Sequence, residues 1–270
     1  MSEHATIKAS DGLSIHYVID DFTDPWRETD TLVMLHSAMS SARRFYSLVP
    51  TLARHFRVVR MDLRGHGESE VPGADSVLDM PRLVADVKEL FDALGLEQAH
   101  LLGNSAGGYV AQNMTFTHPE RIKSLLLFGS TTGLKGTNAV TWIPRVQREG
   151  LRPFLEDTIS YRFDEGVDPG LVKFFLDEVE KNDIGFIARF IPLMTTVDTT
   201  PDLPKIACPV LVVIPGKEEE TGVRNYDAMR TQIRDVTVRV FPGAAHNMMD
   251  SMPDACAEVA LDFLRKRFPA

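Results

Sequence analysis

Ser105 stands where a catalytic nucleophile would be expected. It is the central residue of a Gly-x-Ser-x-Gly pattern, with Gly103 two residues before it and Gly107 two residues after it. A serine hydroxyl is a weak nucleophile until it is held clear of its neighbours and next to a base, and a sharp strand-to-helix turn meets the first condition. Such a turn crowds the backbone and therefore requires small residues at these two positions. The pattern predicts a nucleophile at Ser105.

The segments on either side of the pattern support this interpretation. Residues 99–102 are apolar apart from His100, as expected of a buried parallel strand, and residues 109–116 continue with helix formers as far as a stop at Pro119. The alternative is a glycine-rich turn that only packs a helix against a sheet. We favour the nucleophile because suitable partners follow later in the chain.

The general base is expected near the end of the chain, and His246 meets this expectation. It follows an apolar run at 237–241 through a short loop that contains Gly243, and it precedes the last helical pattern, 253–268. A lone histidine is more often a surface or packing residue, but the order serine, acid, histidine is typical of enzymes built around this turn. The last loop should also lie at the same sheet edge as the turn. We therefore predict His246 as the base.

A carboxylate that orients the histidine is expected in the loop after the preceding strand, residues 210–214. The loop there holds three adjacent candidates, Glu218, Glu219 and Glu220, and a solvated acidic turn explains any two of them. Asp227 and Asp235 lie too far into, or beyond, the next helical pattern. We predict Glu219 as the acid and keep Glu218 and Glu220 as alternatives.

Two backbone N–H groups would have to stabilise the negative charge that develops on a substrate carbonyl oxygen. One is predicted at Ala106, directly after the nucleophile and at the positive end of its helix. The other is predicted at Ala38 or Ser37, in the loop after the third apolar run. We expect the neighbouring His36 to organise this loop rather than to act as a base.

Strand-like apolar runs alternate with helical patterns along the chain, which is typical of a mostly parallel sheet covered by helices on both faces. The fold class is therefore α/β, with eight expected strands. These strands are residues 6–9, 14–19, 31–35, 57–62, 99–103, 122–128, 210–214 and 237–241. The expected helices are residues 42–54, 80–94, 105–117, 223–233 and 253–268.

One long segment interrupts this alternation. About eighty residues separate the runs at 122–128 and 210–214, many more than a crossover helix needs. We predict a helical cap at 133–204, inserted into a catalytic domain made of residues 1–132 and 205–270. The cap contains five arginines, of which one or two are expected to face the site. They are Arg145, Arg148, Arg152, Arg162 and Arg189.

Trp142 and Arg145 are the predicted substrate-binding residues of the cap. They are three positions apart and so share a helical face, where the arginine could pair with a substrate carboxylate and the tryptophan could form an apolar wall. The alternative for Arg145 is an ordinary surface charge on the cap helix. The substrate expected from the first interpretation is a small carboxylated lactone.

Composition limits the classes of partner. A chain of 270 residues with 44% hydrophobic residues can bury one large core, and its net charge of −9 argues against a nucleic-acid or anionic membrane surface. No signal-peptide core and no run of ~18 apolar residues is present, so we expect a cytoplasmic protein. The two cysteines, Cys208 and Cys256, lack metal-type spacing and are expected to be buried, reduced thiols. We expect a small-molecule substrate and leave open a homo-oligomer.

Four stretches of the chain resemble the α/β-hydrolase family, and they cover nearly the whole catalytic domain. They are Val33–His36, Met61–Ser69, Gly103–Gly108 and Gly243–His246. Within the family the chain is most similar to the 3-oxoadipate enol-lactonase branch, through the W-x-x-R pattern of residues 142–145. It also shares Gly-Asn-Ser with serine-dependent C–C bond hydrolases that cleave aromatic ring-fission products.

The chain departs from the family pattern at two places. His36 is followed by Ser37 where the family usually has glycine, although enol-lactonase-like members also show His-Ser. The family acid is commonly Asp in Gly-x-x-Asp, and the position counted from Gly216 is Glu219.

The resemblance implies an α/β-hydrolase fold and acyl transfer to water, without a metal or organic cofactor. His246 would take the proton of Ser105 as the serine attacks an ester or lactone carbonyl, and Glu219 would hold the imidazole. The expected function is that of a serine esterase or lactonase, by analogy one of aromatic degradation. A C–C bond hydrolase of a ring-fission-type diketone is the first alternative, and a non-catalytic ligand receptor is the second.

Overall fold

One eight-stranded sheet organises the protein, for which a computed structural model describes residues 2–222 and 224–269. The strand order is β1-β2-β4-β3-β5-β6-β7-β8. β1 and β4 each pair antiparallel with β2, and the other neighbours are parallel. The strands are β1 Ser2–Lys8, β2 Ser14–Asp20, β3 Thr31–Leu35, β4 Arg57–Met61, β5 Ala99–Asn104, β6 Ile122–Phe128, β7 Val210–Pro215 and β8 Val236–Phe241. The expected mostly parallel sheet is thus confirmed.

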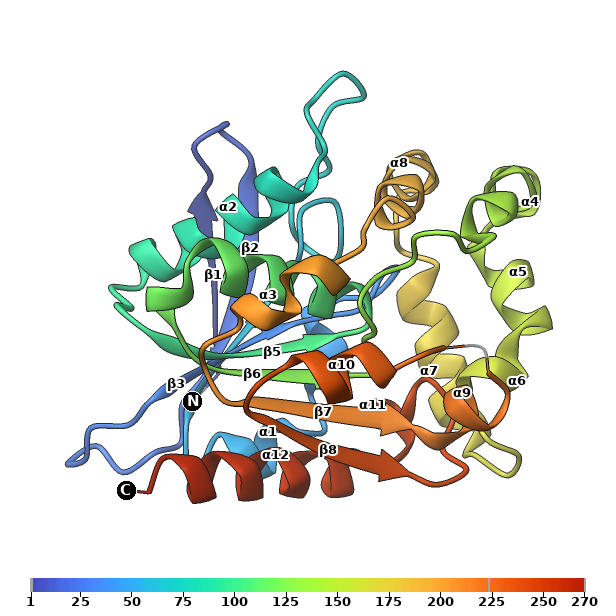
Figure 1. Ribbon diagram of the computed structural model, residues 1–270. Coiled ribbons are helices and arrows are strands. Elements are labelled where there is room, and N and C mark those ends of the chain that lie inside the picture. Colours follow the sequence, from blue (N-terminus) through green and yellow to red (C-terminus); the bar gives the residue numbers. More distant parts are fainter. Residues whose placement is uncertain (1, 223, 270) are drawn as a thin grey trace.

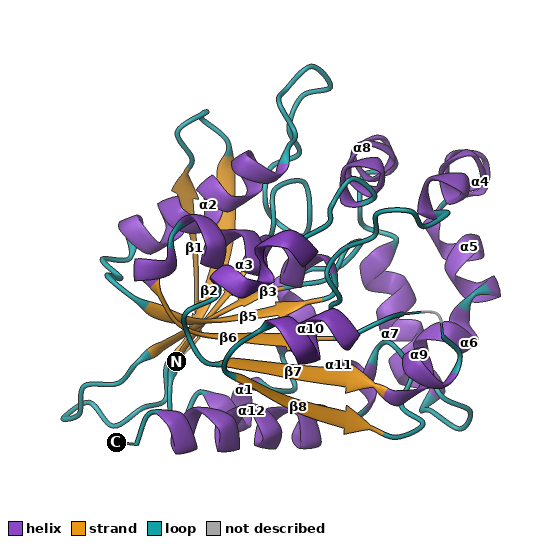
Figure 2. Cartoon of the chain, viewed as in Figure 1, coloured by secondary structure: helices purple, strands orange, loops and turns teal. Residues whose placement is uncertain are grey.

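Helices cover both faces of the sheet (Figures 1 and 2). The α-helices are α1 Val49–Leu52, α2 Met80–Ala93, α3 Ala106–Thr117, α4 Ile143–Glu149, α5 Leu151–Asp157, α6 Ile159–Arg162, α7 Pro169–Val179, α8 Ile184–Met194, α9 Gly216–Glu220, α10 Asp227–Gln232, α11 Met248–Ser251 and α12 Pro253–Arg267. Short 3-10 turns are η1 Ala42–Phe45, η2 Pro119–Arg121, η3 Ala139–Trp142 and η4 Thr200–Lys205.

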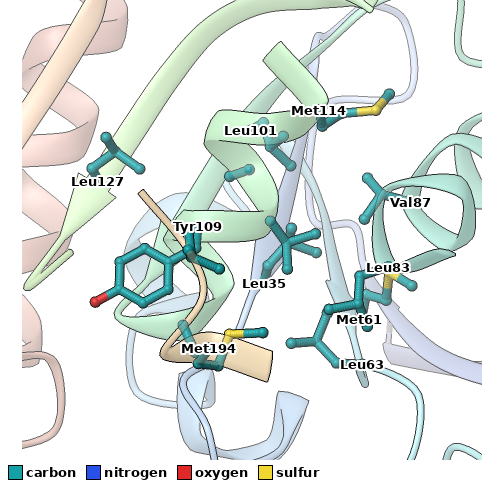
Figure 3. Close-up of a cluster of buried hydrophobic side chains, with 14 of the residues drawn as sticks. Leu35, Met61, Leu63, Leu83, Val87, Leu101, Tyr109, Met114, Leu127 and Met194 are labelled. Carbon is teal, nitrogen blue, oxygen red and sulfur yellow. The ribbon is translucent and has the colours of Figure 1, made fainter. Parts of the chain in front are cut away.

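The buried strands divide their side chains between two cores, because successive residues of a strand point to opposite faces. In β3, Val33 and Leu35 belong to the core under α2 and α3, whereas Leu32 and Met34 belong to the core under α1 and α12. Figure 3 shows Leu35 in the first core, which also contains Tyr109 and Met114 of α3. Burial on both faces explains the nearly continuous apolar runs of β3 and β7.

The order of the strands places a crevice at the carboxyl end of the sheet. β4 lies on one side of β3 and β5 lies on the other. After β3 the chain therefore forms one neighbouring strand first and then crosses to the opposite side to form the next. Ligands of open α/β sheets bind outside the carboxyl ends of strands at such a reversal. The helices α4 to α8, which connect β6 to β7, lie beyond these ends (Figure 1).

Three expectations about single elements need correction. The helix expected at 42–54 is split into η1 and α1, because Pro50 lacks a backbone N–H and is tolerated only in the first turn of a helix. The helix expected at 223–233 begins at Asp227, and Val223 lies outside the described residues, as do Met1 and Ala270 at the ends of the proposed catalytic domain. Residues 216–220 form the helical turn α9 rather than a loop.

Two further sequence expectations concern the thiols and the membrane. Cys256 is buried and Cys208 half-buried, both are free, and burial raises their pKa values to about 12 and about 11. Among the described helices, none combines the length and the apolar character that a membrane crossing requires.

Candidate active site

Ser105 occupies a strained turn between β5, which ends at Asn104, and α3, which begins at Ala106. Its backbone angles are φ +49° and ψ −115°, a region that residues with side chains rarely adopt. Neighbouring groups hold the turn in place. The N–H of Ser105 donates to the Phe128 carbonyl at 3.0 Å, and the Ser130 hydroxyl donates to the Ser105 carbonyl at 2.8 Å. This is the geometry expected of a nucleophile elbow.

The two glycines of the pattern are required by the close approach of the backbone on both sides of this turn. A Cβ atom added to Gly103 would lie 2.4 Å from the Cα of Gly108. A Cβ atom added to Gly107 would lie 2.3 Å from the carbonyl oxygen of Leu35. Neither position can hold a larger residue unless the backbone moves.

His246 lies in the loop between β8 and α11 and faces the serine. Its Nε2 is 3.2 Å from Ser105 Oγ, although the two residues are 141 positions apart in the chain. The structure therefore brings the predicted nucleophile and the predicted base into hydrogen-bond contact.

The prediction of Glu219 as the orienting acid is wrong, because Glu218 takes that place. Glu218 Oε1 is 2.6 Å from His246 Nδ1, and the side chain of Glu218 is 1% exposed. Glu219 turns away and binds both terminal nitrogens of Arg230, and Glu220 accepts from the N–H of Gly243. The reason is local structure. In a helical turn such as α9, successive side chains point ~100° apart, so only one of three adjacent glutamates can face the histidine.

Glu218 stays ionised despite its burial. Burial alone would raise its pKa, but His246, Arg224 at 3.9 Å and the Tyr226 hydroxyl outweigh this and lower the pKa to about 2. The Tyr161 hydroxyl also donates to Glu218 Oε1, at 2.7 Å. Sequence reasoning missed all three neighbours, because no local pattern links Tyr161, Arg224 or Tyr226 to the glutamate.

The short helix α6 of the cap holds the histidine loop. The backbone N–H of His246 donates to the Tyr161 carbonyl at 3.3 Å, and that of Asn247 donates to the Arg162 carbonyl at 2.9 Å. The Tyr161 and His246 rings are stacked, with centroids 5.2 Å apart. The orientation of the imidazole thus depends on the cap as well as on the sheet.

The backbone groups predicted to hold an oxyanion lie around the same cavity as Ser105. Ser37, Ala38 and Ala106 all line this cavity, and Ala106, as the first residue of α3, has no intrahelical acceptor for its N–H. His36 Nε2 accepts from the Leu63 N–H at 3.0 Å, and its Nδ1 is 2.7 Å from the Ser37 carbonyl. This agrees with a loop-organising role for His36. The oxyanion assignment itself stays a prediction.

Of the two predicted cap residues, only Trp142 reaches the cavity. Arg145 does not line it. Its Nε donates to Glu149 at 2.7 Å, and its guanidinium also pairs with Asp157 on the outside of the cap. The substrate-binding role of Arg145 is therefore wrong, because carboxylates one turn along its own helix and on α5 hold it at the surface. Arg162 and Arg224 line the cavity instead.

A buried acid, a histidine and a strained serine lie in one hydrogen-bonded chain at the carboxyl end of a parallel sheet, an arrangement typical of hydrolases. Comparison with known proteins agrees with this class. The profile of the alpha/beta hydrolase family matches residues 32–259, and the chain belongs to this family. The resemblance stated from the motifs is thereby confirmed.

Two curated relatives align over most of their length. 3-Oxoadipate enol-lactonase 2 of Acinetobacter baylyi is 28% identical over 217 residues, which cover 78% of this chain and 79% of the relative. Pimeloyl-[acyl-carrier protein] methyl ester esterase of Yersinia enterocolitica is 24% identical over 251 residues, which cover 87% and 93%. The enol-lactonase structure from Burkholderia xenovorans superposes with a TM-score of 0.86 at 22% identity, covering 96% of this chain and 99% of the other, and shows the shared fold.

Other curated relatives match over a smaller share. Three of them, at 31–36% identity, align with less than half of their own length. Two of these, both from Paraburkholderia, are 2-hydroxy-6-oxononadienedioate/2-hydroxy-6-oxononatrienedioate hydrolases.

Proposed function

We propose that this protein is a serine hydrolase that cleaves a small carboxylic ester or lactone. The observation that carries the proposal is the continuous chain of contacts from Glu218 through His246 to Ser105, at 2.6 and 3.2 Å. In the proposed reaction, His246 Nε2 removes the proton of Ser105 as Oγ bonds to the substrate carbonyl carbon. Glu218 holds the imidazole by its other nitrogen and stabilises the imidazolium that forms.

The remaining steps use the same groups. His246 returns its proton to the leaving oxygen as the C–O bond breaks, which leaves an acyl group on Ser105. Water, deprotonated by His246, then attacks the acyl carbon and releases the carboxylic acid. In a lactone, the leaving oxygen stays joined to the acyl group through the atoms of the former ring, so hydrolysis releases one product that carries both this oxygen and the new carboxyl group. The N–H groups of Ala106 and of Ala38 or Ser37 would stabilise the oxyanion in both halves.

The relatives named above support a choice of ester or lactone, since one is an esterase and one is an enol-lactonase. A C–C bond hydrolase would use the same serine and histidine on a diketone. A kinetic assay distinguishes the two functions. If the protein removes the keto-enol absorbance of a diketone but hydrolyses no ester or lactone, the C–C bond hydrolase is correct and the proposal is wrong.

The test of the proposal is the Ser105→Ala variant. We expect turnover of p-nitrophenyl esters to fall on the order of 10⁴-fold or more, with unchanged thermal unfolding, because the hydroxyl belongs to a group of residues that act as a unit. Wild-type protein should also be labelled by a fluorophosphonate probe, and Ser105→Ala should not. Equal activity of the two proteins would contradict the assignment of the nucleophile.

A further inference from the structure

Arg162 differs from the other buried arginines of the described residues. Four arginine residues are less than 9% exposed, and in three of them the guanidinium binds a buried carboxylate. Arg162, at 8% exposure, has no carboxylate oxygen within 4.0 Å among the residues that the structure describes. The three pairs are Arg44–Asp250, Arg60–Asp20 and Arg64–Asp86.

The hydrogen bonds of Arg162 use only one edge of its guanidinium. Nη1 donates to the Thr158 carbonyl at 3.0 Å and to Thr158 Oγ1 at 2.7 Å. Nε and Nη2 have no protein acceptor among the described residues. Those two nitrogens form the side of the guanidinium that binds a carboxylate through two parallel hydrogen bonds.

Because Arg162 is buried, its charged guanidinium is energetically unfavourable when no anion is bound to it. Burial lowers the pKa of Arg162 to about 10, so the side chain remains a cation at neutral pH, and a buried cation without a partner is strongly unfavourable. Thr158 and the Tyr161 ring, 5.8 Å from the guanidinium carbon, are polar or aromatic neighbours, but neither supplies a negative charge at neutral pH. An anion placed against Nε and Nη2 would supply the missing partner.

The charge of the surrounding cavity favours the same kind of ligand. The wall around Ser105 carries Arg44, Arg162 and Arg224, and its described residues include no Asp or Glu, although the chain as a whole has a net charge of −9. Arg44 is neutralised by Asp250, and Arg224 lies 3.9 Å from Glu218. Among these three arginines, Arg162 is the one without a carboxylate oxygen within 4.0 Å in the described residues.

We propose that Arg162 binds a carboxylate of the substrate, so that the substrate is a small ester or lactone with a second, ionised carboxyl group. This inference rests on the proposed function. Arg162 and Ser105 line one cavity, and Trp142 and Leu155 supply apolar wall there. The fitting substrate has a short apolar chain between the carbonyl that Ser105 attacks and the carboxylate that Arg162 holds.

A matched pair of esters tests the inference. p-Nitrophenyl hemiglutarate is anionic, and p-nitrophenyl valerate has the same number of acyl carbons but ends in a methyl group. We expect the wild type to prefer the hemiglutarate. Arg162→Met should lower kcat/KM for it about 10- to 100-fold, mainly through KM, because a charge-assisted pair is lost. Valerate hydrolysis should change less than about threefold, since it makes no such pair. Arg162→Lys should restore only part of the preference.

Two controls separate binding from a structural role. Arg145→Met removes a cap arginine that is paired at the surface, and it should leave both ester activities unchanged. Arg162→Met should not lower the Tm, because it replaces an unpaired buried cation with an apolar side chain of similar length. A lower Tm with equal losses on both esters would instead show that Arg162 only supports the cap, and would overturn the inference.

A binding measurement tests the role of Arg162 without relying on enzyme turnover. Titration of Ser105→Ala with glutarate in a calorimeter should show binding that the added Arg162→Met change abolishes. If valerate is hydrolysed through Ser105 but glutarate does not bind and the hemiglutarate is not preferred, the carboxylate site is wrong and the hydrolase remains. If neither ester is hydrolysed while glutarate binds through Arg162, the proposed function fails and the anion site stands.

Discussion

Glu218 keeps its charge because three donors surround it. His246, Tyr161 and Tyr226 all place a polar hydrogen against its two oxygens, and Arg224 adds a positive charge nearby. With a pKa of about 2, the carboxylate is ionised throughout the pH range in which the protein would work. The pH dependence of turnover should therefore not follow the titration of this acid.

The neighbouring glutamates offer a direct test of which one acts. Glu218→Gln should lower kcat at least about 10²-fold, because the amide can no longer hold the imidazole in its working tautomer. Glu219→Gln should change kcat by less than about threefold, because it breaks only a half-exposed pair with Arg230. Steady-state kinetics of the two variants on one p-nitrophenyl ester provides the comparison. A larger loss for Glu219→Gln would contradict the geometry of α9.

At the scale of the elements, the close packing of α3 against β3 fixes the position of the turn between β5 and α3, and with it the position of Ser105. α3 approaches the end of β3 at Gly107, where an added Cβ would lie 2.3 Å from a backbone oxygen that cannot rotate away. Any larger side chain there must push α3 away from β3. Since Ser105 is the residue before α3, its hydroxyl would move with the helix.

The Gly107→Ala variant tests this coupling of packing and chemistry. We expect it to lower the free energy of unfolding by about 1–3 kcal/mol through overpacking, and to reduce fluorophosphonate labelling of Ser105. Gly73→Ala is the matched control, because an added Cβ there meets only Ser76 Oγ, at 3.5 Å. Denaturant unfolding and labelling rates should separate the two variants. Normal labelling in Gly107→Ala would show that the turn tolerates a shift of the helix.

At the scale of the whole molecule, buried histidines link stability to pH. Burial, as the largest cause, lowers the pKa of His66 to about 3 and of His100 to about 4, and it also lowers that of His36. These residues are neutral in the folded protein, whereas they take up a proton near pH 6.5 in the unfolded chain. His16 acts in the opposite direction, because its hydrogen bond to Asp62 raises its pKa.

Stability should therefore decrease as the pH falls from about 6.5 toward 4, where the unfolded chain binds more protons than the folded protein. Each such histidine contributes a slope of up to about 1.4 kcal/mol per pH unit. Urea unfolding at pH 5 and pH 7.5 measures this loss. His66→Leu should flatten the dependence by about one proton. An unchanged slope in that variant would mean that His66 is already protonated in the folded state.

The sequence alone was enough to predict the alternation of strands and helices, the turn at Ser105 and the position of His246 beside that turn. Each rests on a pattern that is local or ordered along the chain. Two glycines that flank a serine indicate a tight turn. An apolar run that is followed by a loop indicates where a strand ends and the next helix begins. Parallel strands then bring such loops to one edge whatever their separation in sequence.

Tertiary structure alone decided which carboxylate contacts His246 and which arginine lines the cavity. Glu218 and Glu219 are chemically identical neighbours, and only the helical register of α9 turns the first toward His246. Arg145 and Arg162 are both cap arginines, but acidic residues at 149 and 157 hold Arg145 outside, while α6 buries Arg162 beside the histidine loop. The direction of a side chain depends on the rotation of its helix and on which of several partners it meets in the folded chain, and a local sequence pattern specifies neither of these.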